Sequence, residues 1–380
     1  MRAFLATLLT ACVAFAAAQA PAAPSGGGDA TDPVLRVLLA EGVERFDVHV
    51  GEPHEVRTER AAMRSATPLR WPVEVRDGAL YAAGFAVGPW LTLAPESGVV
   101  EVDGRRYRGA LRLEVADGAL RLVNVVDLEG YLRGVVPAEV PAEWPAAALE
   151  AQAIAARTYT LANLDPAAPY DICATLLCQV YEGVDAEDPR TDAAVRATEG
   201  RVVQVGGEVA RTYYHADSGG RTASAAEVWG YDRPYLRGRT DVAVASPHRG
   251  WTATLAPGRL AAALAAEGRD VGTPTRLEIT ATSASGRASR ARIDGTGGSV
   301  TLAGPRLTRT LRAAGLKSTR VTSVGPLTLR GDGWGHGVGL SQYGAMGLAR
   351  QGRTAEEILA FYYPGTRVAT LTRDVWLAAR

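Results

Sequence analysis

The sequence predicts an α+β fold, in which a β-rich N-terminal meander precedes a mixed α/β core. Three observations support this prediction. In the first third of the chain, short apolar runs alternate with Asp-Gly pairs, which is typical of antiparallel hairpins. The alanine-rich run at 146–163 has helical spacing. Strand and helix patterns then alternate at about 249–324, which indicates a β-rich α+β subdomain inserted into the core.

The composition limits the class of protein. The 380 residues are 47% hydrophobic and 22% charged, which is enough for a substantial core and one to three domains. The formal net charge is zero, and no basic run occurs. Nucleic-acid binders usually carry a basic patch, so we expect no nucleic-acid partner.

The N-terminus has the pattern of an exported protein. Residues 1–20 combine Arg2, an apolar run and a small-x-small cleavage site, as in a signal peptide. We therefore expect the periplasm or cell envelope as its location. Cys12 ends a sequence that resembles a lipoprotein box, but the apolar run continues past it, so a lipid anchor is the less favoured alternative. Residues 21–33 have the composition of a disordered linker.

The N-terminal part, residues 34–121, is predicted to be a meander of short strands. Asp-Gly pairs favour tight hairpin turns, because both positions of such a turn need positive φ angles. The expected turns are Asp77-Gly78, Asp103-Gly104 and Asp117-Gly118. The expected strands are 34–39, 45–50, 69–75, 91–93, 99–102 and 111–115.

The core is predicted to span residues 122–375, beginning with a strand at 122–128. Small residues form one stripe of the helix at 146–163, which implies close packing against another element. A later strand is expected at 209–215, and Thr354 and Glu357 have the spacing of a capping box for a helix at 355–362.

Glycine occupies every second position from Gly331 to Gly339. In an extended strand, this spacing leaves one face without side chains and admits a close approach of another backbone or a flat ligand. An internal packing seam is one interpretation. We favour a binding or catalytic surface, because sequences that break local rules usually do so at functional sites. The opposite face would carry Asp332, Trp334, His336 and Val338.

Glu139 is a better candidate for a functional acid than its neighbours Glu143 and Glu150, because it lies among apolar residues. Pro137 and Pro141 flank it, and valines precede and follow it. An apolar environment raises the pKa of a carboxyl group and keeps it protonated, as a general acid requires. The alternative is a carboxylate that caps the following helix.

Asp217-Ser218-Gly219-Gly220 superficially resembles the nucleophile turn of trypsin-like proteases. Such a serine needs a histidine base and an acid to orient it, and the motif that would supply the histidine is missing. Ser218 is therefore interpreted as a turn residue that could hydrogen-bond a ligand.

Cys173 and Cys178 are the two cysteines of the mature chain. In an exported protein, such a pair favours a local disulfide. A zinc site would need two further ligands close by, and the nearest histidine, His215, is far along the chain. We therefore predict no metal site.

Several longer motifs occur in a fixed order along nearly the whole mature chain. They are Val135-Val-Pro-Ala-Glu-Val-Pro-Ala-Glu-Trp-Pro, Leu149-Glu-Ala-Gln-Ala-Ile-Ala-Ala-Arg-Thr-Tyr, Cys178-Gln-Val-Tyr-Glu-Gly, Tyr214-His-Ala-Asp-Ser-Gly-Gly, Trp334-Gly-His-Gly-Val-Gly-Leu-Ser-Gln-Tyr-Gly-Ala and Phe361-Tyr-Tyr-Pro-Gly-Thr. This set resembles the SpoIID/LytB family, which includes sporulation lytic transglycosylases and amidase-enhancer proteins that act at bacterial peptidoglycan.

The resemblance implies roles for individual residues. Glu139 matches the catalytic acid of the family, and Arg157 matches a functional arginine on the following helix. A glycan groove between the parts of the fold would be lined by Tyr214, His215, Ser218, Gly219, Trp334, His336, Ser341 and Gln342. Some relatives bind zinc through a cysteine pair and neighbouring histidines, but no histidine lies near Cys178 here.

We therefore expect an exported lytic transglycosylase that needs no cofactor. Glu139, as sole acid and base, would cleave the bond between N-acetylmuramic acid and N-acetylglucosamine in peptidoglycan glycan strands, leaving a 1,6-anhydro end. The alternative is a non-catalytic glycan-binding protein that enhances a partner, an N-acetylmuramoyl-L-alanine amidase.

Overall fold

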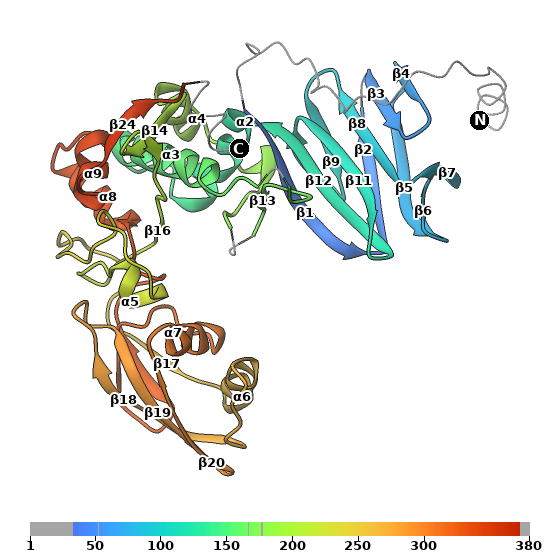
Figure 1. Ribbon diagram of the computed structural model, residues 1–380. Coiled ribbons are helices and arrows are strands. Elements are labelled where there is room, and N and C mark those ends of the chain that lie inside the picture. The colour runs from blue at the N-terminus through green and yellow to red at the C-terminus, as the bar shows by residue number, and fades with distance from the viewer. Residues whose placement is uncertain (1–32, 52, 166, 176–177, 373–380) are drawn as a thin grey trace.

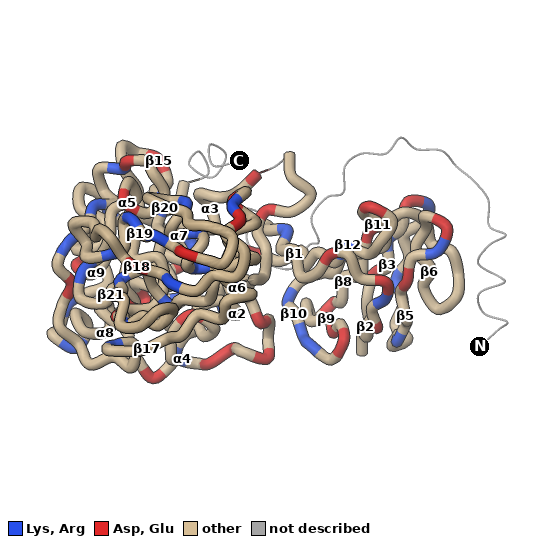
Figure 2. Tube along the Cα trace, turned by 90° about the horizontal axis from the view of Figure 1, so that it is seen from below, with Lys and Arg blue, Asp and Glu red and all other residues tan. Residues whose placement is uncertain are grey.

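The computed structural model describes residues 33–51, 53–165, 167–175 and 178–372 (Figure 1). The predicted signal peptide, Cys12 and nearly all of the predicted linker lie outside these residues. Several β-sheets combine with helices that pack in separate layers, which confirms the predicted α+β class. Within the described residues, no helix has the length and apolar character needed to cross a membrane. Figure 2 shows acidic and basic residues interspersed along the described residues, in keeping with the balanced formal charge.

Two sheets at the N-terminus share one hydrophobic core, to which alternate residues of their strands contribute. The first sheet has the order β13 (Ile172–Cys173), β1 (Val34–Val43), β12 (Ala119–Asp127), β11 (Ala110–Ala116), β8 (Trp90–Pro95), β3 (His54–Thr58) and β4 (Ala62–Ser65). The second has the order β10 (Arg105–Arg108), β9 (Val99–Val102), β2 (Arg45–Val50), β5 (Leu69–Arg76), β6 (Ala79–Ala82) and β7 (Phe85–Gly88). Both residues of each predicted Asp-Gly turn have positive φ, which confirms these hairpins.

Strand β12 leads directly into helix α2 (Leu128–Glu139), which the sequence analysis did not predict. Asp127 caps the helix by accepting a hydrogen bond of 2.6 Å from the backbone N–H of Gly130. Two glycines and Pro137 lower its helix propensity and interrupt the helical spacing of its apolar residues. Burial of most of its apolar side chains offsets that cost. Glu139 is the last residue of this helix.

Helix α3 (Ala146–Leu161) follows and lies at the centre of the core (Figure 1). Its alanines let neighbouring elements approach closely, and nearly all of it is buried. Around it pack α4 (Pro189–Ala197), α8 (Gln342–Arg350), α9 (Ala355–Tyr362) and a sheet of β15 (Glu208–Val209), β14 (Arg201–Val205) and β24 (Arg367–Thr370). The predicted capping box of α9, formed by Thr354 and Glu357, is present. Shorter elements are η2 (Gly183–Ala186), α5 (Ala225–Trp229) and the parallel pair β16 (Tyr214–His215) and β23 (Leu340–Ser341).

Residues 251–331 form a subdomain with a hydrophobic core of its own, centred on residues such as Leu260, Ile293 and Leu311. One three-stranded sheet contains β17 (Trp251–Thr254), β22 (Thr328–Gly331) and β21 (Val321–Ser323). The other contains β18 (Pro274–Thr282), β19 (Ala288–Gly295) and β20 (Gly298–Ala303). The helices are α6 (Pro257–Ala266) and α7 (Gly304–Ala313). In Figure 1 this subdomain lies well away from the N-terminal sheets.

The glycine-rich segment 331–339 is not the regular strand that its spacing predicted. Its glycines from Gly333 onward have φ angles between +72° and +112°, outside the β region. The segment instead pairs irregularly with residues 213–223, for example through mutual backbone hydrogen bonds of Asp217 and Trp334 at 2.8 and 3.0 Å. The expected close approach is present, since a Cβ atom on Gly339 would lie only 2.0 Å from the carbonyl oxygen of Tyr213. We call this contact of 213–223 with 331–341 the glycine seam.

The glycine seam predicts the effect of adding one methyl group. Gly339→Ala should lower the free energy of unfolding by more than the ~1–2 kcal/mol that a positive φ costs, because the new Cβ overlaps a backbone oxygen. Gly352→Ala is the matched control, since Gly352 also has a positive φ but no atom within 4 Å of the added Cβ. Denaturant unfolding measures both losses. Equal losses would contradict a structural role for the close backbone approach.

Candidate active site

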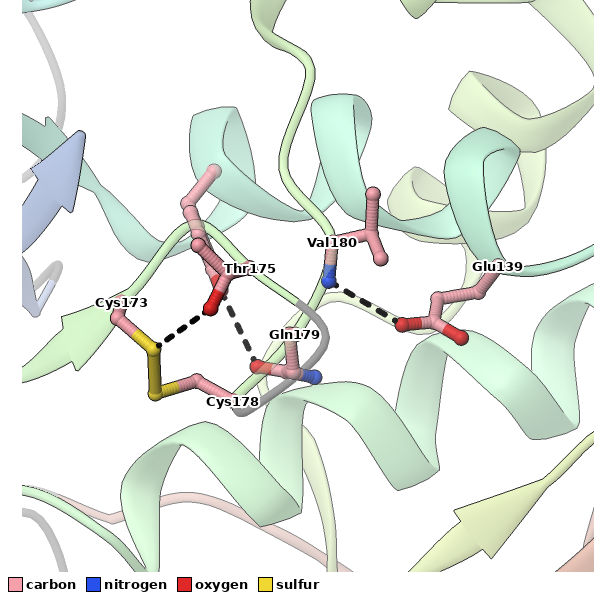
Figure 3. The surroundings of a disulfide bond; sticks show 7 residues. Glu139, Cys173, Thr175, Cys178, Gln179 and Val180 are labelled. Atoms are coloured by element: carbon pink, nitrogen blue, oxygen red, sulfur yellow. Dashed lines mark hydrogen bonds between the residues drawn. A yellow bond between two sulfur atoms is a disulfide. The ribbon is translucent and has the colours of Figure 1, made fainter. Parts of the chain in front are cut away.

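The carboxyl group of Glu139 is held by three neutral hydrogen-bond donors. Oε1 accepts from the backbone N–H of Val180 and the hydroxyl of Tyr214, each at 3.4 Å. Oε2 accepts from the side-chain amide of Gln342 at 3.3 Å. Figure 3 shows the contact with Val180, which approaches α2 from the segment after the disulfide. The three donors therefore bring distant parts of the chain to one carboxyl group.

Burial raises the pKa of Glu139, and the three hydrogen bonds oppose this shift without cancelling it. In the described chain no arginine, lysine or histidine forms an ion pair with Glu139. The carboxyl group therefore favours its protonated form more than an exposed glutamate does. A raised pKa is the shift that a general acid requires, because the group must hold its proton until it donates it.

Gln179 fixes the position of Tyr214, and the sequence analysis did not identify this role. Its buried side-chain amide donates a hydrogen bond of 2.8 Å to the Tyr214 hydroxyl. Its carbonyl oxygen accepts from Tyr131 at 3.3 Å and from Thr160 at 2.7 Å. A buried glutamine with fully engaged amide atoms has a single low-energy orientation, so it also orients the hydroxyl that reaches Glu139. The only signal in the sequence was the position of Gln179 directly after Cys178 in the motif Cys178-Gln-Val-Tyr-Glu-Gly.

A disulfide joins Cys173 and Cys178, with their Cα atoms 5.4 Å apart (Figure 3). Cys173 ends β13, which pairs with β1 of the first N-terminal sheet. Cys178 directly precedes Gln179 and Val180. The disulfide thus ties the segment that contacts Glu139 to the rim of the N-terminal sheet.

Gln342 is positioned by the start of helix α8. Ser341 caps this helix by accepting a hydrogen bond from the backbone N–H of Gly344 at 3.4 Å. The parallel pairing of β16 with β23 then places Tyr214 beside Leu340, so that Tyr214 and Gln342 both reach Glu139. Ser341 itself is fully buried, and its predicted substrate-binding role is replaced by this capping role.

His215 and His336 lie inside the glycine seam, with ring centroids 5.4 Å apart. The Nδ1 atom of His215 lies 3.2 Å from the carbonyl oxygen of Val338, and that of His336 accepts from the Val338 N–H at 3.0 Å. Burial and nearby arginines lower the pKa of His336 to about 3, and burial also lowers that of His215. Both rings are therefore neutral at neutral pH. His215 is buried and packs within the seam, whereas His336 is half-buried, so its contact with glycan stays a prediction.

Ser218 and Gly219 are also part of the interior. The hydroxyl of fully buried Ser218 donates to Asp241 at 2.5 Å and accepts from the backbone of Gly220 at 3.0 Å. A Cβ on Gly219 would lie 2.8 Å from the side chain of Arg320. These contacts agree with the interpretation of Ser218 as a turn residue. They do not agree with the predicted binding of substrate by Ser218 and Gly219, because both residues are buried.

Arg157 does not lie with Glu139, contrary to its predicted catalytic role. Its fully buried guanidinium forms a bidentate pair with Glu129, at 2.8 and 2.6 Å. It also donates to the carbonyl oxygens of Val195 at 3.3 Å and Arg201 at 3.2 Å. The arginine thus connects α3 to the start of α2, the end of α4 and strand β14. Its helical face could not be assigned from sequence without knowing which elements surround α3.

Of the predicted site residues, the structure brings Glu139, Tyr214 and Gln342 together. Trp334 lies on the surface, 45% exposed, where a ligand can reach it. Of the remaining predicted residues, His336 is half-buried and the others are buried, and they support the glycine seam or the packing of α3.

These features belong to a known class of proteins. The sequence model of the SpoIID family, described as stage II sporulation protein, matches residues 116–204, which contain Glu139, Gln179 and Val180. An uncharacterised protein of Brachyspira hyodysenteriae is 32% identical over 364 residues, covering 90% of this chain and 96% of the relative. The chain belongs to the SpoIID/LytB family.

Two further relatives, whose names state a function, are from Bacillus subtilis. The amidase enhancer is 30% identical over 340 residues, covering 74% of this chain but 47% of the relative, so the chain spans about half the length of that protein. Stage II sporulation protein D is 28% identical over 265 residues, covering 65% of this chain and 76% of the relative.

The ion pair of buried Arg157 and half-buried Glu129 predicts a loss of stability when only one partner is removed. Arg157→Met should lower the free energy of unfolding by ~1–3 kcal/mol, because it leaves a half-buried carboxylate and buried carbonyl oxygens without their donor. The double variant Glu129→Leu/Arg157→Met should recover much of this loss. Thermal unfolding measures both. A single variant that unfolds like wild type but loses activity would instead support the direct role predicted from the sequence.

The raised pKa of Glu139 predicts a pH-dependent difference in stability. Folding favours the protonated form, so this group's contribution to stability is present at low pH and is lost as the pH rises through the raised pKa. Glu139→Gln mimics the neutral acid. Its melting temperature should match wild type below pH ~4.3, where a free glutamate is also protonated, and should exceed wild type at pH ~8.

The exposed neighbour Glu143 provides the control for this measurement. Glu143→Gln should show no such gap between low and high pH. A Glu139→Gln variant that is less stable than wild type at pH ~8 would mean that the donors stabilise the ionised form more than burial penalises it.

Proposed function

We propose that the protein is a peptidoglycan lytic transglycosylase with Glu139 as its only acid and base. The observation that carries this proposal is a single carboxyl group of raised pKa, surrounded by neutral donors, in a member of the SpoIID/LytB family. Hydrolytic glycosidases generally need two carboxyl groups, one as acid and one as nucleophile or base. The causes that shift the Glu139 pKa are burial and three hydrogen bonds, and they include no second carboxylate.

One carboxyl group suffices when the substrate supplies its own nucleophile. Glu139 donates its proton to the oxygen that links N-acetylmuramic acid to N-acetylglucosamine, and the bond from C1 to that oxygen breaks. The 6-hydroxyl oxygen of the same muramic residue attacks C1, and its proton passes to the Glu139 carboxylate. The products are a 1,6-anhydro end and a free hydroxyl on the N-acetylglucosamine. The proton on Glu139 is restored, and no water is consumed.

The neighbours of Glu139 suit a group that alternates between acid and base. Burial favours the protonated carboxyl group before the bond breaks. Tyr214, Gln342 and the Val180 N–H donate to its oxygens and stabilise the carboxylate that forms. Because these donors are already in place, little reorganisation accompanies the proton transfer.

The similarity to the amidase enhancer of Bacillus subtilis favours a second candidate. In that case the protein would bind glycan strands and stimulate an N-acetylmuramoyl-L-alanine amidase without cleaving the strands. A protein that only binds glycan has no chemical need for a partly buried acid with three converging donors. This feature is the reason for preferring the transglycosylase.

Digestion of purified glycan strands, followed by mass spectrometry, tests the two candidates. Wild type should release fragments with 1,6-anhydro ends, and Glu139→Gln should reduce their rate of release by a factor of ~100–10,000, as expected for loss of general acid–base catalysis. Sedimentation with insoluble strands should show that the variant still binds glycan, because Gln preserves the shape of the side chain.

Glu143→Gln changes an exposed acid in the loop that follows α2 and should retain full activity. Reducing ends in place of anhydro ends would contradict the intramolecular attack. Binding without any product would reject the enzyme and favour the amidase enhancer.

A further inference from the structure

Four aromatic side chains form a continuous row across the core and the base of the inserted subdomain. The ring of Trp144 lies 5.1 Å from that of Tyr343, which lies 5.2 Å from His248, which in turn lies 4.8 Å from Trp334. Each neighbouring pair meets edge to face, with interplanar angles of 71°, 88° and 87°. None of the four is fully buried, and Trp334 is 45% exposed. We call these four residues the aromatic row.

One end of the aromatic row belongs to the segments that position the candidate acid. Tyr343 directly follows Gln342, whose amide donates to Glu139. Trp144 lies in the turn between α2, which ends at Glu139, and α3. The contact of Trp144 with Tyr343 therefore joins the end of α2 to the start of α8, the same two elements that meet at the carboxyl group.

The other end of the row is fixed by the two segments that enter and leave the subdomain. His248 lies just before β17, and its carbonyl oxygen accepts a hydrogen bond of 2.7 Å from Gly333, just after β22. The indole of Trp251 donates to the carbonyl oxygen of Gly333 at 2.9 Å. Trp334 is in turn bound through its backbone to Asp217 of the glycine seam. These contacts hold the rings in place before a ligand binds. Binding therefore costs little additional side-chain conformational entropy.

The far end of the row carries a cation from the subdomain. The exposed ammonium group of Lys317 lies 5.2 Å from the centroid of the Trp334 ring. The carbonyl oxygen of Lys317 accepts from the Gly335 N–H at 2.8 Å, which holds this segment next to Trp334. A flat apolar ring beside a positive charge suits a ligand that combines an apolar ring face with an anionic substituent.

We propose that the aromatic row binds consecutive sugar rings of a glycan strand on one side of the scissile bond, and that Lys317 contacts a carboxylate on that strand. This inference rests on the proposed function, because Glu139 marks where the bond to be cleaved lies. A chain of sugars matches the extended shape of the row, and muramic residues that carry no stem peptide have a free lactyl carboxylate that can pair with Lys317. The inserted subdomain then helps to hold the substrate, since its connections supply His248 and Trp334.

Binding to a non-cleaving protein tests the row independently of catalysis. In the Glu139→Gln background, isothermal titration calorimetry measures affinity for two probes: a neutral N-acetylglucosamine hexamer and soluble peptidoglycan glycan strands. Trp334→Ala and, separately, His248→Ala should weaken the binding of both probes at least tenfold. Lys317→Met should weaken only the binding of the strands that contain muramic acid. Phe85→Ala removes an aromatic ring that is 49% exposed on β7, far from the row, and should change neither affinity.

The outcomes separate this inference from the proposed enzyme activity. Melting temperatures identify variants that have not folded, and Trp334→Ala should fold normally because Trp334 is 45% exposed. Unchanged affinity for both probes in folded Trp334→Ala and His248→Ala would overturn the aromatic row as a glycan site, even if Glu139 cleaves strands. If these variants lost only the binding of an N-acetylmuramoyl-L-alanine amidase, the row would be a protein interface, which also overturns the proposal. Weakened glycan binding supports the row even if wild type cleaves nothing.

Discussion

The close backbone contact of the glycine seam is the constraint on which the site depends. Residues 213–223 and 331–341 can approach only where no Cβ intervenes, as at Gly339, where a Cβ would lie 2.0 Å from a backbone oxygen. The seam sets the parallel pairing of β16 with β23, which brings Tyr214 and Gln342 to the same carboxyl group. It also encloses His215, which is buried, and holds half-buried His336, and burial lowers the pKa of both rings so that they are neutral.

Two opposing effects act on the pKa of Glu139, and the proposed acid–base role uses both. Burial makes the proton hard to lose, whereas three neutral donors lower the cost of losing it. A cation in their place would hold the carboxylate permanently ionised, and an apolar pocket without donors would hold it permanently protonated. Gln179 and the disulfide support this balance indirectly, because they fix the hydroxyl of Tyr214 and the backbone of Val180 (Figure 3).

Local patterns predicted much of the fold, and tertiary contacts decided the rest. The Asp-Gly turns and the capping box of α9 depend on a few adjacent residues, so the sequence was sufficient. Helix α2 was missed because its stability comes from burial, while Pro137 and its glycines argue against a helix. Apolar neighbours correctly indicated a buried setting for Glu139. Nothing local shows that Arg157 points to Glu129 or that Ser218 faces inward, since both facts depend on elements distant in sequence.

We propose that Glu139 drives an intramolecular attack and not the addition of water. Digestion of purified glycan strands in water enriched in heavy oxygen distinguishes the two reactions, with mass spectrometry of the new ends. We expect anhydro-muramic ends that carry no heavy oxygen, because the new bond to C1 uses the substrate's own 6-hydroxyl. New ends that carry one heavy oxygen atom would show that water attacks C1, and would exclude the intramolecular attack.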